Sequence, residues 1–330
     1  MKRDFDIIAT ISSRILNENV LPELIQEGAT IARLNGAHCS IETLKPMIAD
    51  IRRIAGRNIK IMIDLPGRKV RTRDLVDPIV LRQKGKFHLY SHQVNYAPFL
   101  QMLQKGQEIL ANDGLFRFEV AEKLPDRVTF ISHSEGVLEN NKGLHVINGT
   151  ANVPALLEQD HAIIDLAKKT DVDLLALSFV HTADDVRGCL ECLEGSSVGL
   201  VTKVETQLAV ENLSEILDVS DPILIDRGDL AAEVGVQNVP LVQDHIIREA
   251  LMRDRGILLA TQFLHTMVKQ PTPLIAEVND IHASIRKNVQ GLQLSEETAI
   301  GRYPVECVKI MRGIYEKCSR TEPRAISAAQ

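Results

Sequence analysis

Short apolar runs rich in β-branched residues alternate with longer amphipathic stretches along most of the chain. The short runs predict strands at residues 5–12, 29–36, 58–66, 172–179, 198–205, 222–228, 256–262 and 289–297. Apolar residues at three- and four-residue spacing predict helices near residues 18–27, 41–54, 159–169, 182–193, 207–217, 240–254, 273–286 and 304–318. Eight strand-helix units in series predict an α/β fold, with a parallel sheet closed into a (β/α)8 TIM barrel.

The alternation breaks once, between about Thr72 and Gly149, where turn-rich segments with strand-like patterns replace the expected helix. Residues 106–116, with the turn Asn112-Asp113-Gly114, and residues 128–132 are typical of a small antiparallel β domain. We therefore predict barrel segments at 1–71 and 151–320, an inserted β domain at 72–150 and a tail at 321–330. Because the insertion follows the third strand, we expect it to act as a lid over the carboxyl ends of the barrel strands.

Composition narrows the classes of partner and compartment. The chain has 330 residues, 45% hydrophobic and 25% charged, with a formal net charge of -6 and no contiguous basic stripe, which argues against a nucleic-acid partner. The charged N-terminus and the short apolar runs predict neither a signal peptide nor a membrane segment, so we expect a cytoplasmic protein. Five cysteines, with a single C-x-x-C at Cys189 and Cys192, favour neither a disulfide framework nor a zinc site.

Ionisable residues stand at the carboxyl ends of nearly every predicted strand, where barrel enzymes carry their chemistry. Glu205 and Asp229 offer two hard oxygen ligands on adjacent strands, a set that suits Mg²⁺. Lys203 would place a cation beside that metal, where an enolate oxygen develops charge. Arg33 and Arg71 offer planar forks for a phosphoryl group. The alternative is a set of salt bridges on the barrel rim, but so many residues at successive strand ends argue against it.

Several sequence blocks resemble successive motifs of the pyruvate kinase family, in order from Ile8 to about Lys317. The blocks are residues 32–38, 64–72, 153–160, 171–179, 203–205, 227–230, 260–262, 271–277 and 294–299. The resemblance implies phosphoryl transfer between phosphoenolpyruvate, or a related enolpyruvate, and ADP. Because the sequence has no Gly-x4-Gly-Lys loop, nucleotide binding would depend on the inserted domain.

The resemblance also implies roles for individual residues. Glu205 and Asp229 would bind Mg²⁺ or Mn²⁺, Lys203 would stabilise the enolate, and Thr261 would belong to the proton-delivery site. The transferred phosphoryl group would be held by Arg33 and Arg71. The implied nucleotide and cation contacts are His38, Asp113, Lys142, Asn35, Asp64 and Lys69, and the implied substrate contacts are Arg227, Gly228, Asp226, Ser178 and Phe179.

One departure from the family pattern concerns potassium. Members that need K⁺ hold it with two side chains of the second-strand motif, of which only Asn35 remains because Ala37 replaces the hydroxyl-bearing partner. Lys69 stands where potassium-independent members place a lysine, whose ammonium can substitute for the ion. We therefore expect activity without added K⁺.

A second departure is Asp226, which replaces a small residue beside the backbone amides that bind the substrate carboxylate in the family. An extra carboxylate there would repel an anionic ligand, so one hypothesis is a substituted pyruvate or another small acid as the substrate. The alternative is that Asp226 turns to Arg227 or another nearby cation and leaves specificity unchanged. Glu296 likewise replaces a usual glycine.

Other functions stay open at this point. A Mg²⁺-dependent lyase or decarboxylase acting on a substituted 2-oxo acid would use the same Lys203, Glu205 and Asp229, and a binding protein with a decayed site is a third reading. By analogy, a homodimer through barrel helices is expected. Because the pattern ends with the eighth helix, we do not expect the sugar-phosphate regulation of typical family members.

Overall fold

The computed structural model describes residues 5–17, 19–112, 114–147 and 152–321. The chain divides into two compact units, one formed by residues 1–65 with 159–330 and the other by residues 66–158. Each unit has its own hydrophobic core.

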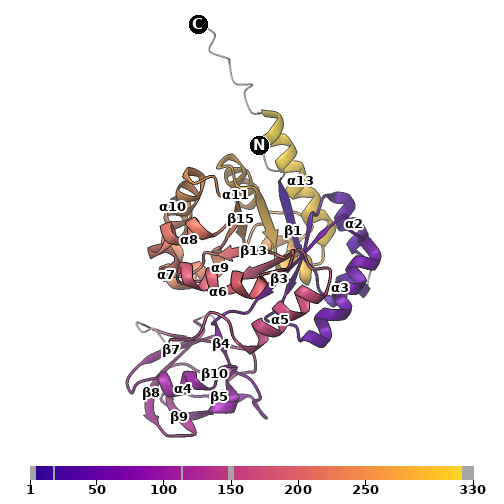
Figure 1. Cartoon of the computed structure of the whole chain (residues 1–330). Coiled ribbons are helices and arrows are strands. Elements are labelled where there is room, and N and C mark those ends of the chain that lie inside the picture. The colour runs from indigo at the N-terminus through magenta and orange to yellow at the C-terminus, as the bar shows by residue number, and fades with distance from the viewer. Residues whose placement is uncertain (1–4, 18, 113, 148–151, 322–330) are drawn as a thin grey trace. The chain divides into compact units, whose positions relative to one another are not determined.

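The first unit is a closed barrel of parallel strands in the order β1-β16-β15-β14-β13-β12-β3-β2 (Figure 1). The strands are β1 (Asp6–Thr10), β2 (Ile31–Asn35), β3 (Lys60–Leu65), β12 (Leu174–Leu177), β13 (Gly199–Lys203), β14 (Ile223–Asp226), β15 (Ile257–Ala260) and β16 (Gly291–Leu294). Most positions in these strands are buried, as expected for strands covered on both faces. The pairing of β1 with β16 closes the sheet, so the prediction of a TIM barrel is confirmed.

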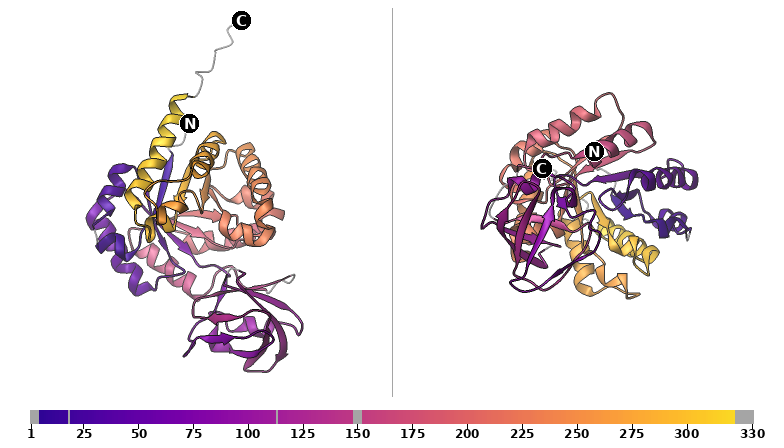
Figure 2. Two further views of the ribbon diagram at one scale, coloured as in Figure 1. Left: turned by 180° about the vertical axis from the view of Figure 1, so that it is seen from behind. Right: turned by 90° about the horizontal axis from the view of Figure 1, so that it is seen from below.

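Helices lie outside the strands of this unit (Figures 1 and 2). They are α1 (Ser13–Asn17), α2 (Leu21–Glu27), α3 (Ile41–Ala55), α5 (Glu158–Lys169), α6 (Ala183–Leu193), α7 (Gln207–Glu211), α8 (Leu213–Val219), α9 (Arg227–Val234), α10 (Val239–Met252), α11 (Ile275–Arg286), α12 (Glu296–Ala299) and α13 (Pro304–Thr321), with 3-10 turns η2 (Val236–Asn238) and η3 (His265–Val268).

Helix α6 illustrates how the sequence sets these helices. The Thr182 side chain accepts a hydrogen bond from the Asp185 backbone N–H, and Asp185 in turn accepts from the Thr182 N–H, a capping box that fixes the start of the helix. The buried residues fall at three- and four-residue spacing on one face: Ala183, Val186, Cys189 and Leu193. The first cysteine of the C-x-x-C is thus a core residue, and none of the five cysteines forms a disulfide.

Several elements differ from the prediction, among them the strand predicted at 289–297, which ends at Leu294 before α12 begins at Glu296. The helix predicted at 207–217 is divided at Asn212 into α7 and α8. The strand predicted at 222–228 ends at Asp226, whose side chain accepts from the Gly228 N–H and so begins helix α9 instead. The physical reason is that an aspartate that satisfies an amide of the first helical turn is a strong helix-start signal, which competes with strand continuation.

The second unit is an antiparallel β domain, as predicted, inserted after β3. Its six-stranded sheet has the order β4-β11-β7-β8-β9-β6, and β10 pairs with β5. The elements are β4 (Val70–Arg71), β5 (Ile79–Leu81), β6 (Lys86–Tyr90), β7 (Glu108–Ala111), β8 (Phe116–Lys123), β9 (Arg127–Ser132), β10 (Gly136–Leu138) and β11 (Gly143–Val146), with η1 (Ser91–Gln93) and α4 (Pro98–Met102). Phe87, Phe118 and Phe130 pack against one another in its core at centroid distances of 4.8 to 6.2 Å.

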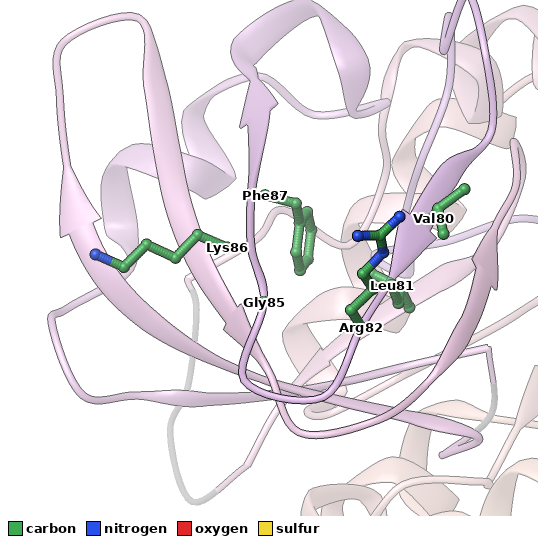
Figure 3. A pocket seen from close by; sticks show the side chains of 6 residues that line it. All are labelled: Val80, Leu81, Arg82, Gly85, Lys86 and Phe87. Atoms are coloured by element: carbon green, nitrogen blue, oxygen red, sulfur yellow. The ribbon is translucent and has the colours of Figure 1, made fainter.

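A pocket of about 270 Å³ lies within this β domain, between β5 and β6. Its lining residues are Val80, Leu81, Arg82, Gly85, Lys86 and Phe87 (Figure 3). No carboxylate belongs to this lining, and the Lys86 side chain extends away from the other labelled residues. The pocket therefore offers neither the metal ligands nor the converging charges that the sequence predicts for the site.

A helix that spans a membrane has to be both long and apolar. Among the described residues, no helix is long and apolar enough to cross a bilayer.

Candidate active site

At the carboxyl ends of the barrel strands, the inward-facing side chains change from apolar to polar. One apolar cluster draws on seven strands: Ile8, Ile31, Met62, Ala176, Val201, Leu224, Leu258 and Ala260. Side chains two positions apart along a strand share a face. The next inward positions toward the carboxyl ends are Thr10, Arg33, Asp64, Ser178, Lys203 and Asp226, and all are buried. A polar layer thus covers the apolar core at the end where barrel enzymes carry their sites.

Lys203, the last residue of β13, contacts most members of this layer. Its Nζ lies 2.9 Å from Glu205 Oε2, 3.3 Å from Asp226 Oδ2 and 3.6 Å from Asp64 Oδ2. It also donates a hydrogen bond of 3.4 Å to Ser178 Oγ. One buried ammonium group therefore partly neutralises three carboxylates that come from different parts of the chain.

Burial and neighbouring charges set the protonation of this group. Burial alone would lower the pKa of Lys203, but Glu205, Asp226 and Asp64 raise that pKa well above its usual value, so the ammonium stays charged. Burial raises the pKa of Glu205 to about 8, against the attraction of Lys203 and with added repulsion from Asp229 and Asp226. Glu205 therefore retains a proton near neutral pH until positive charge is added to the site.

Glu205, Asp226 and Asp229 form an acidic cluster in which one carboxylate oxygen of each residue lies within 4.8 Å of the others. Glu205 Oε1 accepts a hydrogen bond of 2.8 Å from the Phe179 N–H. Glu205 Oε2 has no well-aligned hydrogen bond to any described residue, although Lys203 Nζ is 2.9 Å away. Buried polar atoms need a partner, and Mg²⁺ binds oxygen ligands with one or two carboxylates among them. The donor set therefore fits Mg²⁺ or Mn²⁺.

Arg33, in the middle of β2, forms a buried ion pair with Asp64. Its Nη2 is 2.6 Å from Asp64 Oδ2, and its Nη1 donates a hydrogen bond of 3.1 Å to Thr10 Oγ1. Although burial would raise the pKa of Asp64, Arg33 and Lys203 lower it, so this carboxylate is ionised. Arg33 Nε and Asp64 Oδ1 are buried with no hydrogen-bond partner in the described part of the chain. The pair thus keeps hydrogen-bonding capacity for a ligand.

Asp226, the last residue of β14, faces the same layer. Its Oδ1 accepts hydrogen bonds of 2.6 Å from Thr261 Oγ1 and 3.2 Å from the Gly228 N–H. Burial would raise the pKa of Asp226, but Lys203 and the Thr261 hydrogen bond lower it. The sequence left open whether Asp226 turns to Arg227 or to another nearby cation. Asp226 pairs with Lys203, whereas Arg227 pairs with Asp280.

Arg227 binds the backbone at Thr261, the residue that follows β15. Its Nε and Nη2 donate to the Thr261 carbonyl at 3.1 and 2.5 Å, its Nη1 pairs with Asp280 at 2.6 Å, and its guanidinium lies 4.1 Å from the Phe263 ring centroid. Thr261 and Gln262 have φ values of 83° and 59°, which are strained for residues with a side chain, above all for a β-branched one. Strain of this kind concentrates at functional sites, and Arg227 helps to maintain it.

The second-strand motif turns tightly against β3. The Gly36 N–H donates to the Asp64 carbonyl at 3.1 Å, and a Cβ at position 36 would lie 2.2 Å from that same oxygen, so only glycine fits. Asn35 Oδ1 accepts a hydrogen bond of 3.1 Å from the Ala37 N–H within the turn. His38 lies beyond this turn and is exposed.

Four predicted site residues belong to the β domain and not to the barrel unit. Arg71 ends β4, and its N–H donates to Asn95 Oδ1 at 2.8 Å. The Lys69 side chain packs against the first residue of β11, and Lys142 directly precedes that strand. Asp113 lies outside the described residues. Their roles toward the barrel site therefore stay predictions.

Two inward polar residues were missed by sequence reasoning: Thr10, a member of the layer, and Gln293, which lies one step deeper on β16, at the level of Ile8 and Ala260. Thr10 accepts from Arg33 and donates to the Leu294 carbonyl at 2.8 Å. Gln293 is 1% exposed and pairs in register with Ile8, so it faces inward from β16, and its Oε1 lacks a hydrogen-bond partner among the described residues. Each breaks an otherwise apolar strand at an inward position, and this was the signal available in the sequence.

Comparison with known proteins identifies the family. The family model "Pyruvate kinase, barrel domain" matches residues 2–308. The pyruvate kinase of Borreliella burgdorferi is 33% identical over 325 residues, 95% of this chain and 68% of that protein. The pyruvate kinase of Staphylococcus haemolyticus is 34% identical over 330 residues, 94% of this chain and 56% of that protein.

A solved structure agrees with these matches. The crystal structure of a pyruvate kinase from Cryptosporidium parvum aligns with a TM-score of 0.83 and 26% identity, covering 97% of this chain and 70% of the other. The chain spans 56 to 68% of the length of the two curated relatives named above. Because the family model covers most of the chain and the sequence matches extend over almost all of it, the chain belongs to the pyruvate kinase family.

Proposed function

We propose that the barrel site performs Mg²⁺- or Mn²⁺-dependent phosphoryl transfer between ADP and phosphoenolpyruvate or a related enolpyruvate. The observation that carries this proposal is the buried Lys203 ammonium, 2.9 Å from Glu205 and beside the acidic cluster of Glu205, Asp226 and Asp229. Membership of the pyruvate kinase family supports it independently. The identity of the substrate is part of the proposal.

The metal would be held by Glu205 and Asp229. When bound, a divalent cation supplies Lewis acidity toward a substrate oxygen and balances the carboxylates of the site. Glu205 Oε1 is oriented by the Phe179 N–H, which leaves Oε2 for the cation. In this proposal the proton retained on Glu205 leaves when the metal enters.

Lys203 would stabilise the negative charge on the enolate oxygen. Its ammonium is permanently charged in the site, and it sits 4% exposed, where water does not screen it. Thr261 would hold the proton-delivery position at its hydroxyl, because Asp226 fixes that group at 2.6 Å and Arg227 holds the Thr261 carbonyl. Ser178 would limit the movement of the Lys203 ammonium through its hydrogen bond.

The transferred phosphoryl group would contact Arg33, and Arg71 is the second predicted contact. Arg33 is already oriented by Asp64 and Thr10, so it loses little conformational freedom on binding an anion. A fixed guanidinium suits the spread of charge over the equatorial oxygens in phosphoryl transfer. His38, Lys142 and Asp113 stay the predicted nucleotide contacts, and Lys69 would replace the K⁺ of other family members.

A second candidate function is a Mg²⁺-dependent lyase or decarboxylase that acts on a substituted 2-oxo acid. It would use the same Lys203, Glu205 and Asp229. Asp226 favours it, because this carboxylate is buried among the predicted substrate contacts and adds negative charge to the site. A lyase needs no nucleotide, so protection from thermal unfolding by ADP with Mg²⁺ favours the phosphotransferase, and its absence favours the lyase.

The test is a coupled assay with phosphoenolpyruvate, Mg²⁺ and ADP, followed by a panel of substituted 2-oxo acids and their enol phosphates. We expect turnover with at least one member, and Glu205→Gln should abolish it. Glu249→Gln is the matched control, because Glu249 pairs with Arg253 at 3.0 Å on α10, outside the acidic cluster. Turnover that survives Glu205→Gln at the wild-type rate would contradict the proposal.

A further inference from the structure

The carboxylate of Asp226 is bound by groups that together make an anion site. Its Oδ1 accepts from the Gly228 N–H in the first turn of α9 and from the Thr261 hydroxyl, at 3.2 and 2.6 Å. Its Oδ2 lies 3.3 Å from the Lys203 ammonium. A helix N-terminus, a hydroxyl and an ammonium converging on one point are typical donors for a carboxylate or phosphate. In this chain the Asp226 carboxylate occupies these donors itself.

The backbone around these donors is built for close approach. A Cβ at position 228 would lie 3.0 Å from Thr261 Cγ2, so glycine allows α9 to lie against the exit of β15. Thr261 is held at a φ of 83°, and Arg227 bonds its carbonyl through two nitrogens. The donors come from the end of β13, the residue after β15 and the first turn of α9, and β13 and β15 both pair with β14. Strain and tight packing therefore keep the Thr261 hydroxyl and the α9 amide aimed at one place.

Asp226 also changes the charge that a ligand meets. With every carboxyl group ionised, the described part of the site has four carboxylates and two cations, a formal charge of -2: Asp64, Glu205, Asp226 and Asp229 with Arg33 and Lys203. A divalent cation brings this charge to zero, whereas the same site without Asp226 would carry one positive charge. The metal-loaded site thus has one positive charge fewer with which to hold an anionic substrate.

We propose that Asp226 is a specificity-determining residue, a built-in carboxylate that occupies the donors a substrate carboxylate would need. The substrate class that fits is a 2-oxo or enol compound whose C1 group is uncharged and donates a hydrogen bond, such as an amide. A free carboxylate would have to displace Asp226 and lie beside it, and like charges in a buried site repel strongly. This inference rests on the proposed function, because it assumes that the substrate reaches Lys203 and the metal.

The experiment compares two ligands that differ at this one group, pyruvate and pyruvamide. Their affinities are measured by isothermal titration calorimetry with saturating Mg²⁺, for wild type, Asp226→Ala and Asp226→Asn. We expect wild type to bind pyruvamide at least as tightly as pyruvate. Both variants should shift the affinity ratio toward pyruvate by at least about tenfold, because a like-charge juxtaposition is removed.

The control is Thr182→Ala, which removes the side-chain cap of α6 and leaves the barrel mouth intact. A purely structural disturbance of α9 would lower the affinities for both ligands together. The ratio of the two affinities therefore reports specificity and not folding. A wild type that prefers pyruvate, or an unchanged ratio in both variants, overturns the inference. Mn²⁺ binding in the same samples separates this inference from the proposed function. If Mn²⁺ binds but the affinity ratio does not change, only this inference fails. If wild type binds no Mn²⁺, the proposed function fails as well.

Discussion

Replacing Lys203 by methionine removes the ammonium and keeps most of the side-chain volume. Glu205, Asp226 and Asp64, at 2.9, 3.3 and 3.6 Å, then lose their nearest shared cation, and Arg33 remains paired with Asp64 alone. At an effective dielectric constant of about 20, each of these contacts represents about 5 kcal/mol of gross Coulomb energy. Desolvation of the charges offsets much of this energy, and removal of one partner from a buried ion pair typically costs about 3–5 kcal/mol.

We therefore expect Lys203→Met to lower the free energy of unfolding by about 3–5 kcal/mol in EDTA, measured by urea denaturation with circular dichroism. The double variant Lys203→Met/Asp226→Asn should recover more than about 1 kcal/mol of that loss, because it removes one of the unpaired carboxylates. The surface pair Lys287 and Asp244 provides the control, since Lys287→Met should cost less than about 1 kcal/mol. A loss in Lys203→Met as small as the control, or no recovery in the double variant, would refute the buried network.

Three further predictions follow from single features of the structure. Because the proton on Glu205 leaves as a metal enters, Mg²⁺ affinity measured by calorimetry should rise with pH up to about 8, the pKa of that group, and level off above it; a flat profile from pH 6 to 8 would contradict the raised pKa. Gly36→Ala should lower the free energy of unfolding by about 3 kcal/mol, because its Cβ would overlap the Asp64 carbonyl, whereas Gly188→Ala, with open space around it, should be neutral or stabilising in the same urea titration. Turnover should not change when K⁺ is replaced by tetramethylammonium at constant ionic strength, and Lys69→Met should create a K⁺ requirement; a steep K⁺ dependence in wild type would refute this role for Lys69.

The barrel was predictable because its signal is local and repeated. Strands such as β13 and β14 are short runs that begin with apolar residues and end in polar ones, and period-2 alternation then assigns the inward positions that end in Lys203 and Asp226. The acidic residues at strand ends were visible for the same reason. The start of α9 was missed because Asp226 suits both the end of a strand and the cap of a helix, and only the contact with the Gly228 N–H decides between them.

Features that depend on contacts between distant segments could not be predicted. The sequence marked Asp226 as a misfit but gave no means to tell that its two oxygens face Thr261 and Lys203, which lie 35 and 23 positions away in the chain. The positive φ of Thr261 could not be predicted from the sequence either. Threonine rarely adopts this conformation, and its cause is the hydrogen bonds that Arg227 donates to the Thr261 carbonyl. Gln293 was detectable in principle, as the one polar residue inside the β16 run, but its inward direction follows only from the register with Ile8.

The central claim is that Glu205 and Asp229 hold one divalent cation beside the Lys203 ammonium. Its most direct test is anomalous diffraction from crystals of the full chain soaked in Mn²⁺, collected near the manganese absorption edge. The account predicts a single anomalous peak within coordination distance of a carboxylate oxygen of both residues, lost in Glu205→Gln. A peak bound elsewhere, or no peak in wild type at saturating Mn²⁺, would contradict it.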